Sequence, residues 1–105
     1  MEKDYVESSG NVFADMGLPD AEDALAKAEL ACLIELAIKA KGMTQKQAAE
    51  VLGIDQPKVS AVVRGRLSGF SLDRLMRFLV LLGNDVEIVV KEKAKEDAPA
   101  RLRVA

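Results

Sequence analysis

Residues 43–65 read MTQKQAAEVLGIDQPKVSAVVRG, and this stretch decides the fold because it holds two short helical patterns separated by a glycine. Thr44 is a good N-cap for a helix over 45–52, since its hydroxyl can accept a hydrogen bond from a free first-turn amide. Gly53 then permits the positive φ that ends a helix. The stretch therefore begins with a short helix whose two ends are both marked in the sequence.

The second pattern begins at Asp55, whose carboxylate can cap a helix over 56–63. Pro57 falls in the first turn, where its missing N–H removes no hydrogen bond. Apolar residues line one side of each helix: Ala48, Ala49 and Leu52 in the first, Val59, Val62 and Val63 in the second, and Ile54 at the corner. Small alanines suit two short helices that cross steeply, so the stretch predicts a helix-turn-helix.

The outward side of the second helix carries side chains that can read DNA in a major groove. Gln56 can pair with adenine, Lys58 with guanine, and the methyl group of Ala61 can rest on a thymine methyl, so we expect these residues to contact bases. Contacts with the DNA backbone are expected from Thr44, Gln45, Arg64, Arg66 and Ser68. The alternatives without function are a helical bundle with solvated polar faces and a solvated turn at 65–69.

Residues 43–65 resemble the helix-turn-helix of the Xre/Cro and phage-repressor family. The resemblance is carried by Thr44-Gln45, the Ala-x-x-x-Gly step at Ala49 and Gly53, and Val59 and Val62. The resemblance implies a domain of four to five helices in which Gln45 contacts a phosphate and holds the Gln56 side chain in position. Pro57 departs from the family pattern, in which a polar residue usually stands at this position, so one potential base contact is absent.

Charge is distributed unevenly along the chain, whose net charge is −2. Residues 1–42 hold four basic and nine acidic residues, residues 43–83 hold six and three, and residues 84–105 hold five of each. Positive charge is thus concentrated on the helix-turn-helix segment, as a phosphate-facing surface requires. The field is weak, so we expect useful DNA binding to need two copies acting together.

Composition narrows the possible functions of this single 105-residue domain. Cys32 is the sole cysteine and histidine is absent, which argues against a disulfide framework, a Cys/His metal site and histidine-based catalysis. We expect no enzymatic activity and no cofactor, and a buried packing role for Cys32. Because no apolar run approaches membrane-spanning length and the first residues are charged, we expect a cytoplasmic protein without a membrane anchor.

A further helix is predicted over 72–82, capped by Ser71 and ended by Gly83. Its apolar residues are too many for one stripe, so part of its surface is expected to pack against a partner chain. They are Leu72, Leu75, Met76, Phe78, Leu79 and Leu82.

The segment after this helix is rich in β-branched residues, and we predict a strand over 84–91. A solitary strand has unpaired amides and carbonyls, so we expect it to pair with its symmetry mate across a twofold axis. The dimer contacts would come from Val86, Ile88 and Val90. Pairing inside the chain with residues 5–14 is the alternative.

The N-terminal part is predicted to be an extended arm over 1–18, followed by a long helix over 21–41. ESSGNVFADMGLP at 7–19, followed by AEDALAKAEL, resembles the front end of Xre-like antitoxins encoded beside ribosome-dependent RNA-cleaving toxins. This resemblance implies that an acidic arm binds and covers a basic toxin. Its charge would come from Glu7, Asp15, Asp20, Glu22 and Asp23. The alternative is a disordered, solubilising tail.

Together these observations predict a mainly α-helical, phage-repressor-like fold with one C-terminal strand. Its parts are an arm (1–18), a helical domain (19–83), a dimerisation strand (84–91) and a disordered tail (92–105). The predicted function is that of a homodimeric repressor that binds operator DNA, and of an antitoxin that neutralises a ribosome-dependent RNase toxin. Two alternatives stay open: a stand-alone Xre-type regulator, and a protein-interaction module with a helix-turn-helix shape.

Overall fold

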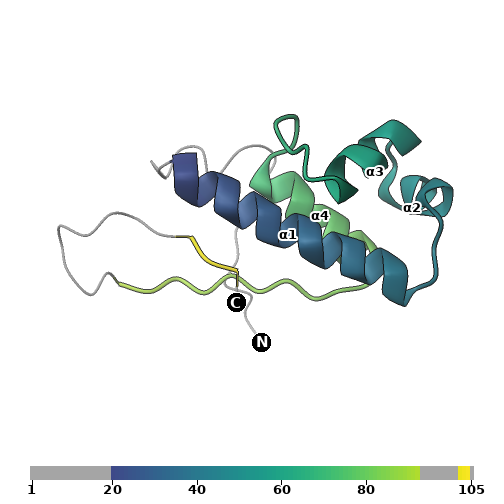
Figure 1. Cartoon of the computed structure of the whole chain (residues 1–105). Coiled ribbons are helices and arrows are strands. Elements are labelled where there is room, and N and C mark those ends of the chain that lie inside the picture. Colours follow the sequence, from purple (N-terminus) through teal and green to yellow (C-terminus); the bar gives the residue numbers. More distant parts are fainter. Residues whose placement is uncertain (1–19, 93–101, 105) are drawn as a thin grey trace.

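The fold is seen in a computed structural model that describes residues 20–92 and 102–104 (Figure 1). The helices in these residues are α1 (Asp20–Ala40), α2 (Gln45–Leu52), α3 (Gln56–Val63) and α4 (Leu72–Leu81). The long helix α1 packs along α4, and α2 and α3 form a short crossed pair beside one end of them (Figure 1). The mainly helical prediction is confirmed, with four helices in the described part of the chain.

The ends of α2 and α3 are fixed by the residues that the sequence indicates. The Thr44 hydroxyl accepts the Gln47 amide at 3.1 Å, and the Gln47 side-chain oxygen accepts the Thr44 amide at 2.9 Å, which forms a capping box. Gly53 ends α2 with a φ of 70°. The Asp55 carboxylate accepts the Lys58 amide at 3.0 Å at the start of α3. These caps satisfy amides that would otherwise lack partners, so the boundaries of both helices agree with the prediction.

The hydrophobic core lies where α1, α3 and α4 meet, with α2 closing one end. Its largest fully buried side chains are Ile34, Val59, Val62, Leu75 and Leu82. In α2 the predicted apolar side is buried as well, through Ala48, Ala49 and Leu52. Val63 and Ile54 are half-buried and pack against this core. The core therefore holds α3 by its inner side and leaves the outer side free.

The apolar side of α4 is covered by the same chain. Met76 is half-buried, and the other residues expected on that apolar surface are buried. The buried ones are Leu72, Leu75, Phe78, Leu79 and Leu82. The prediction that part of this set packs against a partner chain is therefore wrong, because α1 and α2 cover it. The exposed apolar residues of α4 are instead Val80 and Leu81.

Cys32 is exposed, so the prediction that it is a buried packing residue is wrong. The cause lies in α1, which carries apolar side chains around most of its circumference. The buried residues of this helix are Ala26, Leu30, Ala31, Ile34 and Ile38. Cys32 lies on the other side of the helix, where Leu25 and Leu36 are also exposed. Apolar periodicity alone could not tell which of the two sides faces the core.

Residues 84–92 form an extended segment without strand assignment, which runs back along the length of α1 in the view of Figure 1. The predicted strand is absent from the described residues of the single chain, because a strand needs a neighbour with which to exchange hydrogen bonds. Val86 is half-buried against the core, whereas Ile88 and Val90 are 43% and 89% exposed. Pairing with a second copy stays a prediction, and residues 5–14 lie outside the described part.

Residues 102–104 lie against the first turns of α1. The Leu102 amide donates to the Glu22 carboxylate at 3.3 Å, and Leu102 and Val104 are half-buried against the core. A disordered tail was predicted over 92–105, but these three residues are held in place because the apolar side chains of Leu102 and Val104 pack against the core.

The predicted arm over 1–18, with Glu7 and Asp15, lies outside the described residues. Asp20, Glu22 and Asp23, whose charge was assigned to this arm, lie in the first turn of α1. None of the described helices combines the length and the apolar character needed to cross a membrane.

Candidate nucleic-acid interface

The first turn of α3 forms the outer edge of the helix-turn-helix. Gln56, Pro57 and Lys58 are exposed, whereas Val59 and Val62 are only 1% and 2% exposed. Valines three residues apart fasten one side of the helix to the core, so the polar residues of the first turn are directed to solvent. The two residues expected to make polar contacts with bases therefore stand where a duplex can reach them.

Gln45 and Gln56 are brought together at the start of their helices. With Pro57 and Ser60 they line a shallow, open hollow of about 330 Å³. Ser60 was not singled out from the sequence, because a serine inside a helix usually indicates a solvated position. Its spacing of four residues from Gln56 is the signal that places both on one helical face. The hollow offers two amides and a hydroxyl, which can donate to phosphate and base atoms.

Ala61 is less available to DNA than the sequence predicts. It is half-buried and packs against the core cluster, because it lies between the core-facing residues of α3 and the outer edge of the helix. Only part of its methyl group can reach a thymine.

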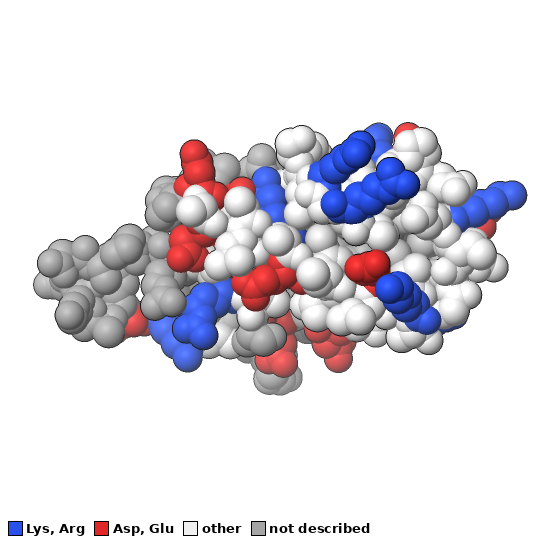
Figure 2. Space-filling model, in the orientation of Figure 1, with Lys and Arg blue, Asp and Glu red and all other residues white. Residues whose placement is uncertain are grey.

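The basic side chains of the site lie at both ends of α3. Arg64 ends the helix, Arg66 follows in the loop, and both are exposed, as are Ser68 and Thr44. The Lys58 ammonium lies 3.9 Å from the Asp55 carboxylate, a long contact between two exposed groups that holds the lysine only weakly. Lys and Arg side chains gather over α3, whereas Asp and Glu side chains lie along α1 (Figure 2).

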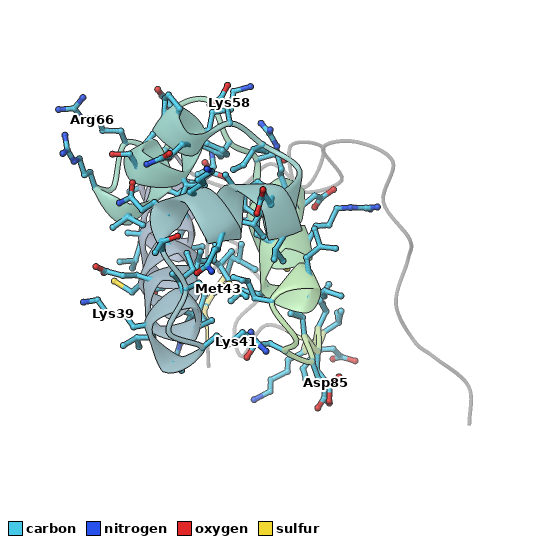
Figure 3. All side chains as sticks on the ribbon, turned by 90° about the vertical axis from the view of Figure 1, so that its right-hand side faces the viewer. Lys39, Lys41, Met43, Lys58, Arg66 and Asp85 are labelled. Atoms are coloured by element: carbon cyan, nitrogen blue, oxygen red, sulfur yellow. The ribbon has the colours of Figure 1, made fainter. Side chains whose placement is uncertain are left out.

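Lys58 and Arg66 project from the same end of the molecule, away from Lys39 and Lys41 at the end of α1 (Figure 3). This arrangement gives one end of the domain a positive charge, which attracts the phosphates of DNA.

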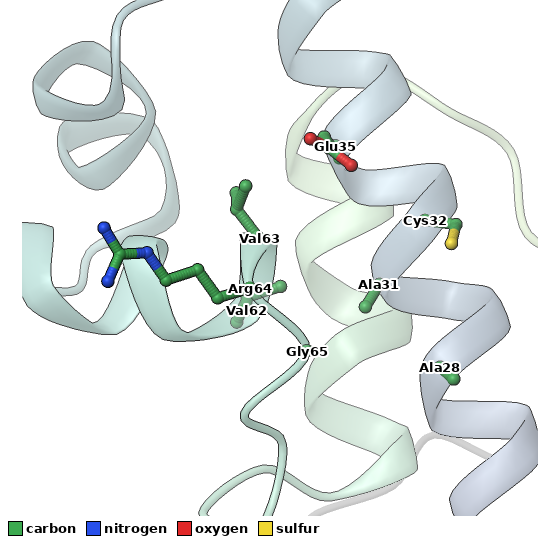
Figure 4. Close-up of a pocket in the computed structure, with 8 residues that line it drawn as sticks. All are labelled: Ala28, Ala31, Cys32, Glu35, Val62, Val63, Arg64 and Gly65. Carbon is green, nitrogen blue, oxygen red and sulfur yellow. The ribbon is translucent and has the colours of Figure 1, made fainter.

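A second hollow, of about 210 Å³, lies between α1 and the end of α3 (Figure 4). It is lined by Ala28, Ala31, Cys32, Glu35, Val62, Val63, Arg64 and Gly65. The Arg64 side chain points away from α1, so its guanidinium is not directed at Glu35 (Figure 4). Arg64 is therefore placed to meet a phosphate beside α3.

Aromatic contacts hold the loop that carries Arg66 and Ser68. The Phe70 and Phe78 rings meet edge to face with their centroids 6.1 Å apart. The Arg74 guanidinium lies 5.0 Å from the centroid of the Phe70 ring, within the range of a cation–π contact. The sequence did not predict these contacts, because they join residues on either side of the Ser71 cap. They fix the exit of the loop against α4.

Comparison with known proteins identifies a matching family model and a similar solved structure. A family model described as a helix-turn-helix domain matches residues 12–91, which include all four described helices and most of the extended segment. A solved structure provisionally described as an XRE family transcriptional regulator is 45% identical, with a TM-score of 0.75, over 83% of this chain and 98% of that chain. No curated protein matches the chain.

Proposed function

Since the chain belongs to the XRE-type helix-turn-helix family, we propose that it is a sequence-specific DNA-binding repressor that works as a homodimer and has no catalytic role. The single observation that carries this proposal is the exposed first turn of α3. There Gln56 and Lys58 face solvent while valines hold the other side of the helix in the core. The description of the similar solved structure as a transcriptional regulator supports the same function.

In the proposed complex α3 lies in the major groove, which is about 12 Å wide and admits a helix. Gln56 and Lys58 would contact base edges, with a smaller contribution from the half-buried Ala61. Backbone contacts would come from the exposed or half-buried residues on either side of α3, namely Thr44, Gln45, Arg64, Arg66 and Ser68. Phosphate contacts of this kind position the helix, and the base contacts supply the specificity.

The replacement of Gln56 by alanine is expected to reduce the preference for operator over random DNA. A bidentate base contact is worth about 1–3 kcal/mol, so the ratio of the two affinities should fall by about 5- to 150-fold. Fluorescence anisotropy titrations with both duplexes at one salt concentration measure this ratio. If the variant bound every sequence more weakly by the same factor, Gln56 would only position the helix.

A homodimer is proposed because the helix-turn-helix segment is only weakly basic and the segment over 84–91 pairs with no strand in the described part of the chain. In the described part of the chain, the amides of residues 85–92 donate no hydrogen bond to the backbone, and Ile88 and Val90 are exposed. Strand pairing about a twofold axis would satisfy these amides and cover the side chains. It would present two α3 helices to half-sites about 34 Å apart.

The replacement of Ile88 by proline is expected to shift the protein towards monomer, because proline removes a ladder amide. The dimer dissociation constant should rise by about tenfold or more, because each of the two chains loses one ladder hydrogen bond. Sedimentation velocity at several concentrations measures it, with Ile88→Thr as the control that keeps the amide and the branched shape. An unchanged sedimentation profile would rule out pairing through this segment.

We further propose that the protein is the antitoxin of a toxin-antitoxin pair and neutralises a ribosome-dependent RNase toxin. The proposal is supported by the resemblance of residues 7–30 to antitoxin front ends and by the acidic character of residues 1–42. A stand-alone regulator is the second candidate, because the similar solved structure is described only as a transcriptional regulator. Binding of the product of the neighbouring reading frame would distinguish the two.

A further inference from the structure

The outer side of α1 carries large hydrophobic side chains opposite the core. Leu25 is 56% exposed, Leu33 is 40% exposed and Leu36 is 61% exposed, with the exposed Cys32 among them. Positions 25, 29, 32 and 36 follow one another at spacings of three and four, so they form one continuous stripe on the helix. We call this stripe, with Leu33, the outer face of α1. None of the other described segments buries it.

Acidic residues accompany this face. α1 contains five acidic residues and two lysines, which gives the helix a net charge of −3. Both lysines are already paired within the helix, Lys27 with Asp23 at 3.1 Å and Lys39 with Glu35 at 3.5 Å. Glu29 lies within the stripe, and Asp and Glu side chains are spread along α1 in Figure 2. Glu29 therefore gives the outer face a negative charge among its exposed apolar residues, on a helix that is negative overall.

We propose that the outer face of α1 is the docking surface for the basic protein partner of the proposed antitoxin function, and the inference rests on that function. An apolar centre with charged neighbours is the usual composition of a protein interface. A second copy docked here would place a helix of net charge −3 against another of the same charge, and DNA would be repelled. A protein with positive charge around exposed apolar side chains complements both features.

The proposed docking surface and the DNA-contacting residues lie on different sides of the domain. In Figure 3, Lys58 and Arg66 project from one end of the molecule, whereas Lys39 projects from the last turn of α1. The two regions approach each other at the hollow where Cys32 and Glu35 lie near Arg64 (Figure 4). A variant of the outer face is therefore expected to lose the partner and keep operator binding.

The test uses the purified product of the neighbouring reading frame and titration calorimetry with the full chain. The double variant Leu25→Gln/Leu36→Gln should bind this protein at least about tenfold more weakly, because truncated interface anchors cost more than 1 kcal/mol each. Glu29→Lys should also weaken binding and make it less sensitive to salt. The control Val51→Gln/Val80→Gln changes two exposed apolar residues elsewhere and should stay within about twofold of the parent.

Each other outcome overturns the inference in a recognisable way. If the parent and the Leu25→Gln/Leu36→Gln variant bound equally well, the partner would dock elsewhere, and the proposed antitoxin function would be unaffected. If the parent chain did not bind this protein, both the proposed antitoxin function and this inference would be wrong. Conversion of Leu25→Gln/Leu36→Gln to a monomer would assign the face to a second copy. A fall in its melting temperature of more than about 5 °C would assign it to other residues of the same chain.

Discussion

Reversal of two charges on α3, in a Lys58→Glu/Arg64→Glu variant, is expected to abolish operator binding while the fold and the proposed dimer persist. Both side chains are exposed, so the core does not depend on them. The change turns the net charge of residues 43–83 from +3 to −1. Loss of one base contact and one phosphate contact, with new repulsion added, predicts an affinity at least about 100-fold lower.

Anisotropy titrations at constant salt measure the loss, and circular dichroism and sedimentation check fold and dimer. The matched control is Lys39→Glu/Lys41→Glu, which makes the same change in net charge at the far end of α1 (Figure 3). It should weaken binding only slightly, because charges beyond a Debye length of about 10 Å are screened. Retained binding by the α3 variant would show that this helix does not enter the groove.

The second large effect concerns stability, and it is expected for Leu75→Ala. Leu75 lies in α4, is 0% exposed, and belongs to the helix pair that supports the helix-turn-helix. Loss of a buried leucine side chain typically costs about 2–5 kcal/mol, since a cavity is left where the side chain packed. That is a large fraction of the total stability of about 5–15 kcal/mol that small domains have.

Urea unfolding followed by circular dichroism measures this loss as a lower midpoint at unchanged slope. Val80→Ala is the control in the same helix, because Val80 is 53% exposed. It should change the free energy of unfolding by less than about 0.5 kcal/mol. A loss below about 1 kcal/mol for Leu75→Ala would contradict the placement of this residue at the centre of the core.

Local signals made the helix-turn-helix predictable. Thr44, Gly53 and Asp55 act within three or four residues of where they stand, so their roles can be seen without knowledge of the rest of the fold. The inner sides of α2 and α3 were predictable for a similar reason, since short amphipathic helices have one apolar side each.

What the sequence left open depends on contacts between distant residues. Cys32 was misplaced because α1 is apolar on two sides, and only packing against α4 decides which side is buried. The strand over 84–91 was predicted from β-branched residues, but strand structure requires a neighbouring strand that the single chain does not supply in its described part. The burial of Ser60 and Ala61 was not predictable either, because a small rotation of α3 about its own axis decides how far each side chain is exposed.

The two helices of the DNA-contacting unit have only eight residues each. Helices of this length are mostly unfolded as isolated peptides in water, because nucleation costs more than so few hydrogen bonds return. α3 therefore owes its shape to the valines that hold it on the larger helices. In the proposed repressor, operator binding would last only as long as the whole domain stays folded, so a protease that degrades the chain would also restore expression of the target gene.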